Sequence, residues 1–173
     1  TWTSSGTLNS GRLNSGAAGI QTAALAFGGD TGGSPPAGPL LSATEEYNGS
    51  TWTTVPGTLS IAKDQMASAG TQTAALSAGG ADATFVNTAG TEEYSISGEP
   101  NTFQNVGQVW YNGTTKALKF TDQAFVGSWA SGGNKANQSE SAAGAGTKTA
   151  ALSFGGNPPA GLPNVTAVTE EYD

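Results

Sequence analysis

Three short segments of the chain share one pattern of apolar and small residues, and all three end in a glycine pair. They cover residues 20–29, 71–80 and 147–156, and each contains Thr-Ala-Ala-Leu followed after two residues by Gly-Gly. An apolar run that glycine closes after about eight residues is shorter than the 10 to 12 residues expected of a helix. Small side chains with glycine at the end are typical of a buried strand with close neighbours. The pattern therefore predicts three inner β-strands and almost no helix.

The inner strands belong to a longer repeat, in which each follows a tryptophan and precedes a Glu-Glu-Tyr segment. Asn48-Gly49, which lies between one Glu-Glu-Tyr segment and the next tryptophan, is the strongest short-range signal for a tight hairpin turn. A glycine-rich segment, residues 16–19 in the first copy, supplies an entry strand. Each copy thus predicts a four-stranded antiparallel blade. The structural repeat positions are Trp2, Gly28, Gly29, Tyr47, Trp52, Gly79, Gly80, Tyr94, Trp129, Gly155, Gly156 and Tyr172.

A glycine pair that closes a strand, then a tyrosine and shortly afterwards a tryptophan, resembles the kelch motif when it recurs in this way. The resemblance implies an all-β fold of kelch-like β-propeller blades, three in this chain, on their own or within a larger propeller. Kelch repeats usually carry a basic residue ahead of the inner strand. Arg12 and Lys63 stand near that position, and the third copy offers Lys135 or Asn137.

The amino-acid sequences of the copies show a second resemblance. Gly-Thr-Gln-Thr-Ala-Ala-Leu and Glu-Glu-Tyr-Asn-Gly-Ser-Thr-Trp-Thr are similar to kelch-like repeats in predicted structural proteins of tailed phages, notably those that infect marine cyanobacteria. This similarity implies a virion component rather than an enzyme.

An insertion separates the second and third copies. We divide the chain into kelch-like repeats one and two at residues 1–100, an inserted β-hairpin segment at 101–127, and repeat three at 128–173. Within the insertion, residues 108–111 and 117–121 flank Asn112-Gly113 and read as two strands about a turn. This hairpin is an extra edge ribbon without a ligand, a joint between sets of blades, or a contact to a neighbouring subunit. Trp110 and Tyr111 lie outside the repeat and are the candidates for partner contact.

The amino-acid composition excludes most kinds of catalytic chemistry. The 173 residues include no histidine and no cysteine, so the usual general base, transition-metal ligands and thiol nucleophile are missing. The adjacent glutamates of each Glu-Glu-Tyr segment could only serve as a glycosidase pair, but neighbours on a strand point to opposite faces. They recur in every copy, as fold-forming residues do. We therefore expect that the protein is not an enzyme, that it has no catalytic or metal-binding residues, and that it binds no cofactor.

Charge and hydropathy limit the partners. A net charge of −7 with six basic residues argues against nucleic acid, and no apolar run is long enough for membrane insertion. Asp30, Asp82 and Asp122 could contribute to a calcium site, but they lack the Asp-x-Asp-x-Asp spacing, so solvated loop acids are the expected reading. The repeated aromatic residues are expected to pack between blades, with a sugar-stacking platform as the alternative.

These observations favour a non-enzymatic structural or adhesion component, a phage tail, fibre or capsid appendage in the virion or at an extracellular surface. Its partners would be copies of itself or other virion proteins; the alternative is a carbohydrate-binding propeller module that recognises surface glycans. The chain starts at the strand of Trp2 and stops at the strand of Tyr172, so its terminal blades are incomplete. Because open strand edges tend to pair, we expect residues 1–173 to occur within a longer chain or a homo-oligomer rather than as a closed monomer.

Overall fold

The structure, a computed structural model, describes residues 1–32, 38–98, 109–112, 117–120, 125–159 and 167–173. These residues form β-strands and no helix, so the described part of the chain has no helix able to cross a membrane. The prediction of an all-β fold is confirmed. The three Ala-Ala-Leu strands are Ala23–Phe27 (β2), Ala74–Ala78 (β7) and Ala150–Phe154 (β14), and each lies between two antiparallel neighbours, as expected of inner strands.

The first sheet has four antiparallel strands in sequence order. They are Gly16–Ile20 (β1), β2, Thr44–Tyr47 (β3) and Trp52–Val55 (β4). The expected turn at Asn48-Gly49 joins β3 to β4, and Tyr47 pairs with Trp52 across it. The Asn48 side chain accepts hydrogen bonds from the backbone N–H groups of Ser50 at 3.0 Å and Thr51 at 2.9 Å, which fixes the turn.

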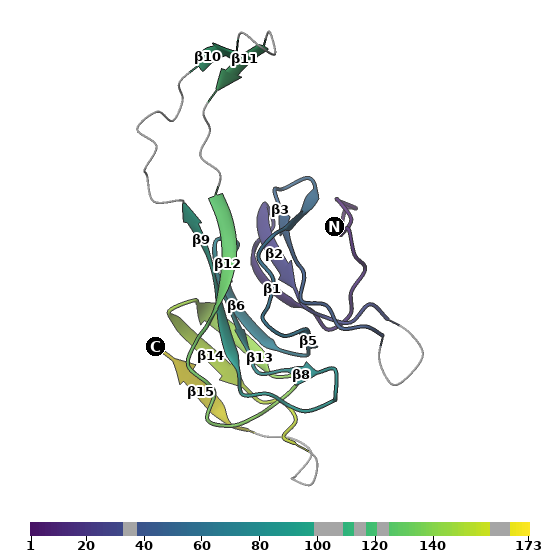
Figure 1. Ribbon diagram of the computed structural model, residues 1–173. Coiled ribbons are helices and arrows are strands. Elements are labelled where there is room, and N and C mark those ends of the chain that lie inside the picture. Colours follow the sequence, from purple (N-terminus) through teal and green to yellow (C-terminus); the bar gives the residue numbers. More distant parts are fainter. Residues whose placement is uncertain (33–37, 99–108, 113–116, 121–124, 160–166) are drawn as a thin grey trace.

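The second sheet has the same strand order, and its last two strands are longer than those of the first sheet. It consists of Ala67–Thr71 (β6), β7, Thr91–Gly98 (β9) and Phe125–Ser131 (β12). Tyr94 pairs with Trp129, so the strand of the third tryptophan completes the second sheet. The insertion therefore lies where the first sheet has its Asn-Gly turn. Within it, Val109–Asn112 (β10) and Ala117–Phe120 (β11) form the expected hairpin, which Figure 1 shows standing beyond the ends of β9 and β12.

The third sheet has three described strands, where the repeat predicted four. They are Ala143–Thr147 (β13), β14 and Thr169–Tyr172 (β15). The Trp2 segment, the remaining candidate for a fourth strand, forms no strand, and its side chain is fully exposed. The reason is that the residues following it are bound to the first sheet: Ser5 contacts the Tyr47 hydroxyl, and the backbone N–H of Asn9 donates to Glu45.

The three sheets follow one another through their entry strands, and β6 contacts both β1 and β13 (Figure 1). These strands consist largely of glycine, alanine and serine, whose small side chains allow the backbones to approach. The backbone N–H of Ala17 in β1 donates directly to the Ser68 hydroxyl in β6 at 3.2 Å. Two short strands, Lys63–Asp64 (β5) and Ala81–Asp82 (β8), pair at one end of this row. The main core lies between the first and second sheets and contains Leu25, Phe27, Leu59, Met66, Ala75 and Tyr94.

The glycine pairs end the inner strands in a backbone conformation that other residues rarely adopt. Both glycines of each pair have positive φ, as in Gly28 at 62° and Gly29 at 93°. In this region a Cβ atom clashes with the backbone, so glycine is the residue that fits. The backbone N–H of Gly29 then donates to the carbonyl of Lys63 at 2.9 Å, and that of Gly80 donates to Ser139 at 3.1 Å. The first two pairs thus bind the segment that leads into the next sheet.

Candidate functional site

The first glutamate of each Glu-Glu-Tyr segment binds the loop that leads into its own sheet. In the first sheet Glu45 is fully buried and accepts hydrogen bonds from the backbone N–H groups of Asn9 at 2.7 Å and Ser10 at 3.1 Å. Arg12 forms an ion pair with the same carboxylate at 2.5 Å and also donates to three backbone carbonyls. A buried carboxylate needs such charge and hydrogen-bond partners. Glu45 and Arg12 therefore hold the entry loop against the sheet.

The second sheet repeats this arrangement with a lysine. Glu92 forms an ion pair with Lys63 at 3.3 Å and accepts from the backbone N–H of Ser60 at 2.7 Å. Both charged side chains are buried. Burial lowers the pKa of Lys63, and the neighbouring Glu92 opposes that change. Arg12 and Lys63, singled out in the sequence as the basic residues ahead of the inner strand, thus share one role.

In the third sheet the glutamate is Glu170, which accepts hydrogen bonds from the backbone N–H groups of Ala136 at 2.8 Å and Asn137 at 3.0 Å. The sequence left Lys135 and Asn137 as alternatives for the basic position. The structure gives the cation to Lys135, whose pKa is lowered by burial while Glu170 opposes the change. Asn137 contributes its backbone to Glu170.

Lys135 does not occupy the repeat position of Lys63, although its ammonium group lies near the corresponding glutamate. Ser139 is the counterpart of Lys63, because its carbonyl accepts from Gly80 as that of Lys63 accepts from Gly29. The ammonium group of Lys135 donates to the hydroxyls of Ser139 at 2.6 Å and Ser153 at 2.8 Å. The cation is therefore kept although its position in the sequence has moved.

In the first two Glu-Glu-Tyr segments the second glutamate points to the opposite face and binds the next sheet. The Tyr94 hydroxyl, in the second sheet, donates to Glu46 of the first at 2.8 Å, and the Tyr172 hydroxyl, in the third, donates to Glu93 of the second. Lys148 adds an ion pair to Glu93 at 3.1 Å. Burial, reinforced by Glu46, raises the pKa of Tyr94, and the Tyr172 hydroxyl lowers the pKa of Glu93. The same tyrosine-to-glutamate bond thus joins both pairs of neighbouring sheets.

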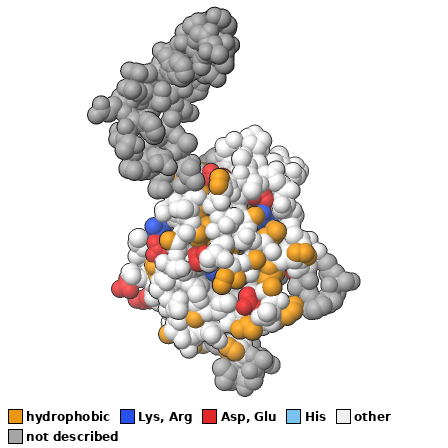
Figure 2. All heavy atoms as spheres, in the orientation of Figure 1, with side chains coloured by type: hydrophobic (Ala, Val, Ile, Leu, Met, Phe, Trp, Pro, Cys, Tyr) orange, Lys and Arg blue, Asp and Glu red, His pale blue; other side chains and the backbone are white. Residues whose placement is uncertain are grey.

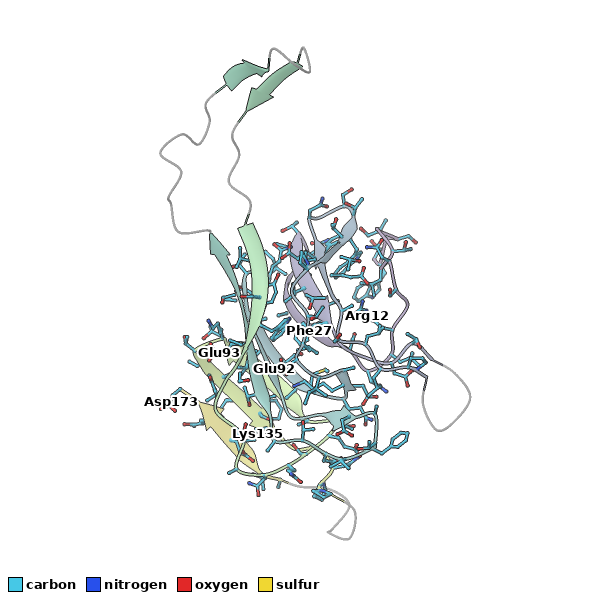
Figure 3. The ribbon with its side chains drawn as sticks, in the orientation of Figure 1. Arg12, Phe27, Glu92, Glu93, Lys135 and Asp173 are labelled. Carbon is cyan, nitrogen blue, oxygen red and sulfur yellow. The ribbon has the colours of Figure 1, made fainter. Side chains whose placement is uncertain are left out.

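Trp129 lies between the first and second sheets. Its ring meets Phe27 of the first sheet edge-on, with centroids 4.8 Å apart, and lies 5.3 Å from the Tyr94 ring of its own sheet. The indole N–H donates to the Thr44 hydroxyl at 3.0 Å. Figure 3 shows Phe27 on the side of the first sheet that faces the second. Trp129 therefore has the packing role expected of the repeated tryptophans.

The other two repeated tryptophans differ from Trp129. Trp52 packs on Tyr47 of its own sheet, with ring centroids 5.0 Å apart. Trp2 is fully exposed and makes none of the ring contacts recorded among the described residues. The expectation of packing between blades is therefore wrong for Trp2 within a single chain.

A cavity of about 340 Å³ lies between the second and third sheets. Its lining combines apolar side chains with charged and hydroxyl groups and includes Ala78, Thr91, Lys135, Ala151, Leu152 and Tyr172. Ala78 occupies the repeat position of Phe27, which fills the corresponding space between the first and second sheets. The smaller side chain is one reason why this space is hollow.

Carboxylates meet at one further place, a pocket lined by Asp30, Asp64 and Asp82. Asp82 accepts from the backbone and hydroxyl of Thr84 at 2.8 and 2.6 Å, and Asp30 accepts from the backbone N–H of Gly32 at 2.6 Å. Burial raises the pKa of Asp64. In the part of the chain that the structure describes, no group of three or more acidic side chains is arranged to hold a metal ion. Asp122, the third sequence candidate, lies outside the described residues.

The candidates for partner contact in the insertion are on β10. In the backbone register of the hairpin, Trp110 pairs with Lys119 and Tyr111 with Leu118. Their side chains lie outside the part of the structure described here, and partner contact stays a prediction.

Searches with protein-family models and against curated proteins found no match to this chain. The kelch and phage resemblances therefore depend on the repeated residues themselves.

Proposed function

We propose that this protein is a non-enzymatic structural or adhesion component of a virion, a tail, fibre or capsid appendage built from kelch-like β-propeller blades. Its role is protein–protein assembly or contact with the host surface. Each antiparallel sheet corresponds to one blade, and the row of entry strands β1, β6 and β13 corresponds to the centre of the propeller.

The observation that carries this proposal is the set of contacts that the repeated ionisable side chains make. Glu45 and Glu92 bind cations and entry loops, while Glu46 and Glu93 bind tyrosines of the next sheet. These groups are the ones a carboxylate-based enzyme would require. Because they are already engaged in joining loops and sheets, they support a structural role over a catalytic one.

The surface is consistent with a particle component. Figure 2 shows few charged side chains on the visible face, which consists mainly of uncharged polar groups and scattered apolar ones. This visible face offers no basic patch for a nucleic acid backbone. It suits contacts with other proteins or with a neutral host surface.

Carbohydrate binding is the alternative, and two observations favour it. Trp2 presents an unobstructed aromatic face, and the cavity between the second and third sheets is lined by both apolar and polar side chains. Sugar sites use this combination, because a pyranose ring packs on apolar surface while its hydroxyls need hydrogen bonds. Against it, Trp52 and Trp129 are engaged by Tyr47, Tyr94 and Phe27.

Antibody labelling of purified virions from the phage that encodes the chain tests the virion proposal. We expect labelling at a tail, fibre or capsid appendage, and unlabelled particles would contradict it. A glycan array tests the alternative. Binding that Trp2→Ala abolishes, with the fold intact by circular dichroism, would favour the carbohydrate-binding module.

A further inference from the structure

The outer edge of β15 is the starting point. In the first two sheets the Glu-Glu-Tyr strand pairs on one side with the Ala-Ala-Leu strand and on the other with a tryptophan strand, in the registers Tyr47 with Trp52 and Tyr94 with Trp129. In the third sheet, β15 pairs with β14, and no other described strand pairs with it. A free strand edge exposes unpaired N–H and C=O groups and readily accepts another strand.

The face of the third sheet is also uncovered. Leu152 and Phe154 are 40% and 41% exposed, whereas their counterparts in the first sheet, Leu25 and Phe27, are fully buried beneath the second sheet. The Glu171 carboxylate is exposed as well, although its counterparts Glu46 and Glu93 each bind a tyrosine of the following sheet. The third sheet therefore presents the same docking face that the first two already use.

The cavity matches a tryptophan at the missing strand. Trp129 is held by Phe27, Thr44 and Tyr94. The residues one repeat later are Ala78, Thr91 and Tyr172, and all three line the cavity of about 340 Å³. With alanine in place of phenylalanine, the space can take a whole aromatic side chain, since small-molecule sites begin at roughly 300 Å³.

The chain carries a segment whose sequence fits the missing strand. Thr1-Trp2-Thr3 repeats Thr51-Trp52-Thr53, and Trp2 is fully exposed. By the register of the first sheet, Trp2 would lie opposite Tyr172 and Ser5 opposite Thr169. The indole would then enter the cavity with its N–H directed at Thr91.

The chain's own N-terminus cannot reach this edge. Ser5 and Asn9 are bound to Tyr47 and Glu45 of the first sheet, and the second sheet lies between the first and the third. The four residues before Ser5 extend at most about 14 Å. Two sheet-to-sheet spacings amount to about 20 Å. Figure 1 accordingly shows the N-terminus beside β3 and the C-terminus on the far side of the third sheet. Residues 1–5 can therefore pair with this edge only from another molecule.

We infer that residues 1–5 of a second copy pair with β15 as the fourth strand of the third sheet and place Trp2 in the cavity beside Thr91. Tyr47 of the second copy then faces Glu171, as Tyr94 faces Glu46. Because each copy carries both the strand and the edge, the docking is reciprocal, and two copies bring together six sheets, within the range of about four to eight blades in closed propellers. The inference rests on the assembly role in the proposed function and names its partner.

Sedimentation velocity of residues 1–173 over a range of concentrations tests this inference. We expect a species of twice the 17.1 kDa chain mass, and a blue shift of tryptophan emission as Trp2 becomes buried. Trp2→Ala should weaken association by about 30-fold or more, as for a buried aromatic anchor. Thr91→Val should weaken it less, by about tenfold, through loss of the hydrogen-bond acceptor.

Phe85→Ala is the matched control, because it removes another exposed aromatic side chain, one that does not line the cavity between the second and third sheets, and it should leave association unchanged. Circular dichroism should be the same for all variants, since Trp2 makes no ring contact in the described part of the single chain. A chain that stays monomeric at all concentrations, or one whose association Trp2→Ala does not weaken, would overturn the inference. Virion labelling is independent of this result, so a monomer found on the virion would contradict the inference and leave the proposed function standing.

Discussion

Replacing Glu45 by glutamine is the sharpest perturbation of the contacts that hold the entry loops. The carboxylate faces Arg12 and two backbone N–H groups, and the Glu45 and Arg12 side chains are each 1% exposed. Glutamine keeps the shape of the side chain but removes the charge. The NH₂ group of the glutamine would also face an N–H donor, at a place where the carboxylate oxygen accepts a hydrogen bond.

The expected cost follows from leaving a buried guanidinium without its counter-ion. Removal of one partner of a buried ion pair typically destabilises a protein by about 3–5 kcal/mol. Arg12 keeps its bonds to three backbone carbonyls, so we place Glu45→Gln near the lower value, about 3 kcal/mol. Because whole domains are stable by only about 5–15 kcal/mol, this loss is easily measured.

Urea unfolding at neutral pH, followed by circular dichroism, gives the free energy of unfolding. Glu92→Gln should cost about as much as Glu45→Gln, because Lys63 is equally buried. Glu170→Gln, at a half-buried site, should cost about 0–1 kcal/mol, and the exposed control Glu171→Gln at most about 0.5 kcal/mol. Equal losses at Glu45 and Glu171, or a loss below about 1 kcal/mol at Glu45, would refute the reasoning.

Three further predictions concern the interface between the first and second sheets. Phe27→Ala should lower the free energy of unfolding by about 3–5 kcal/mol in the same urea assay, because it empties a fully buried site against Trp129. Gly127→Ala should be strongly destabilising, since a Cβ there would lie 1.6 Å from the Tyr94 hydroxyl, whereas Gly90→Ala, with nothing within 4 Å, should change little; equal effects would contradict the packing. Because the pKa of Tyr94 is raised in the folded protein, this residue contributes to the free energy of unfolding. The contribution is fully present below the ordinary tyrosine pKa of about 10, and it is lost as the pH rises through the pKa of the folded state. Tyr94→Phe should therefore reduce the alkaline fall in stability, and an unchanged pH profile would argue against the Glu46 contact.

The strands could be predicted because their signals are local. A glycine pair with positive φ ends each inner strand, and Asn48-Gly49 forms a tight turn whatever surrounds it. Such features depend on backbone conformation within a few residues, so the pattern of the sequence is sufficient to predict them.

The contacts between sheets could not be predicted in the same way. The bond from Tyr94 to Glu46 depends on how two sheets stack, and the repeat of Glu and Tyr indicated only that both were structural. Lys135 occupies the cation position from a different point in the repeat, which spacing alone left undecided. That the Trp2 segment forms no strand follows from the binding of the residues after it to Tyr47 and Glu45.

Disulfide trapping tests the central claim of reciprocal docking most directly. The chain has no cysteine, so Ser5→Cys with Thr169→Cys introduces the only thiols. Their counterparts, Val55 and Thr44, lie opposite each other in the first sheet. Directly opposed residues in antiparallel strands are about 4.5–5.5 Å apart between Cα atoms, which suits a disulfide.

On oxidation, the double variant should run as a covalent dimer on a non-reducing gel, and addition of Trp2→Ala should prevent this. Each single cysteine variant should stay monomeric under the same conditions. A disulfide formed within one chain, or a double variant that keeps free thiols at concentrations where the unmodified protein associates, would contradict the account.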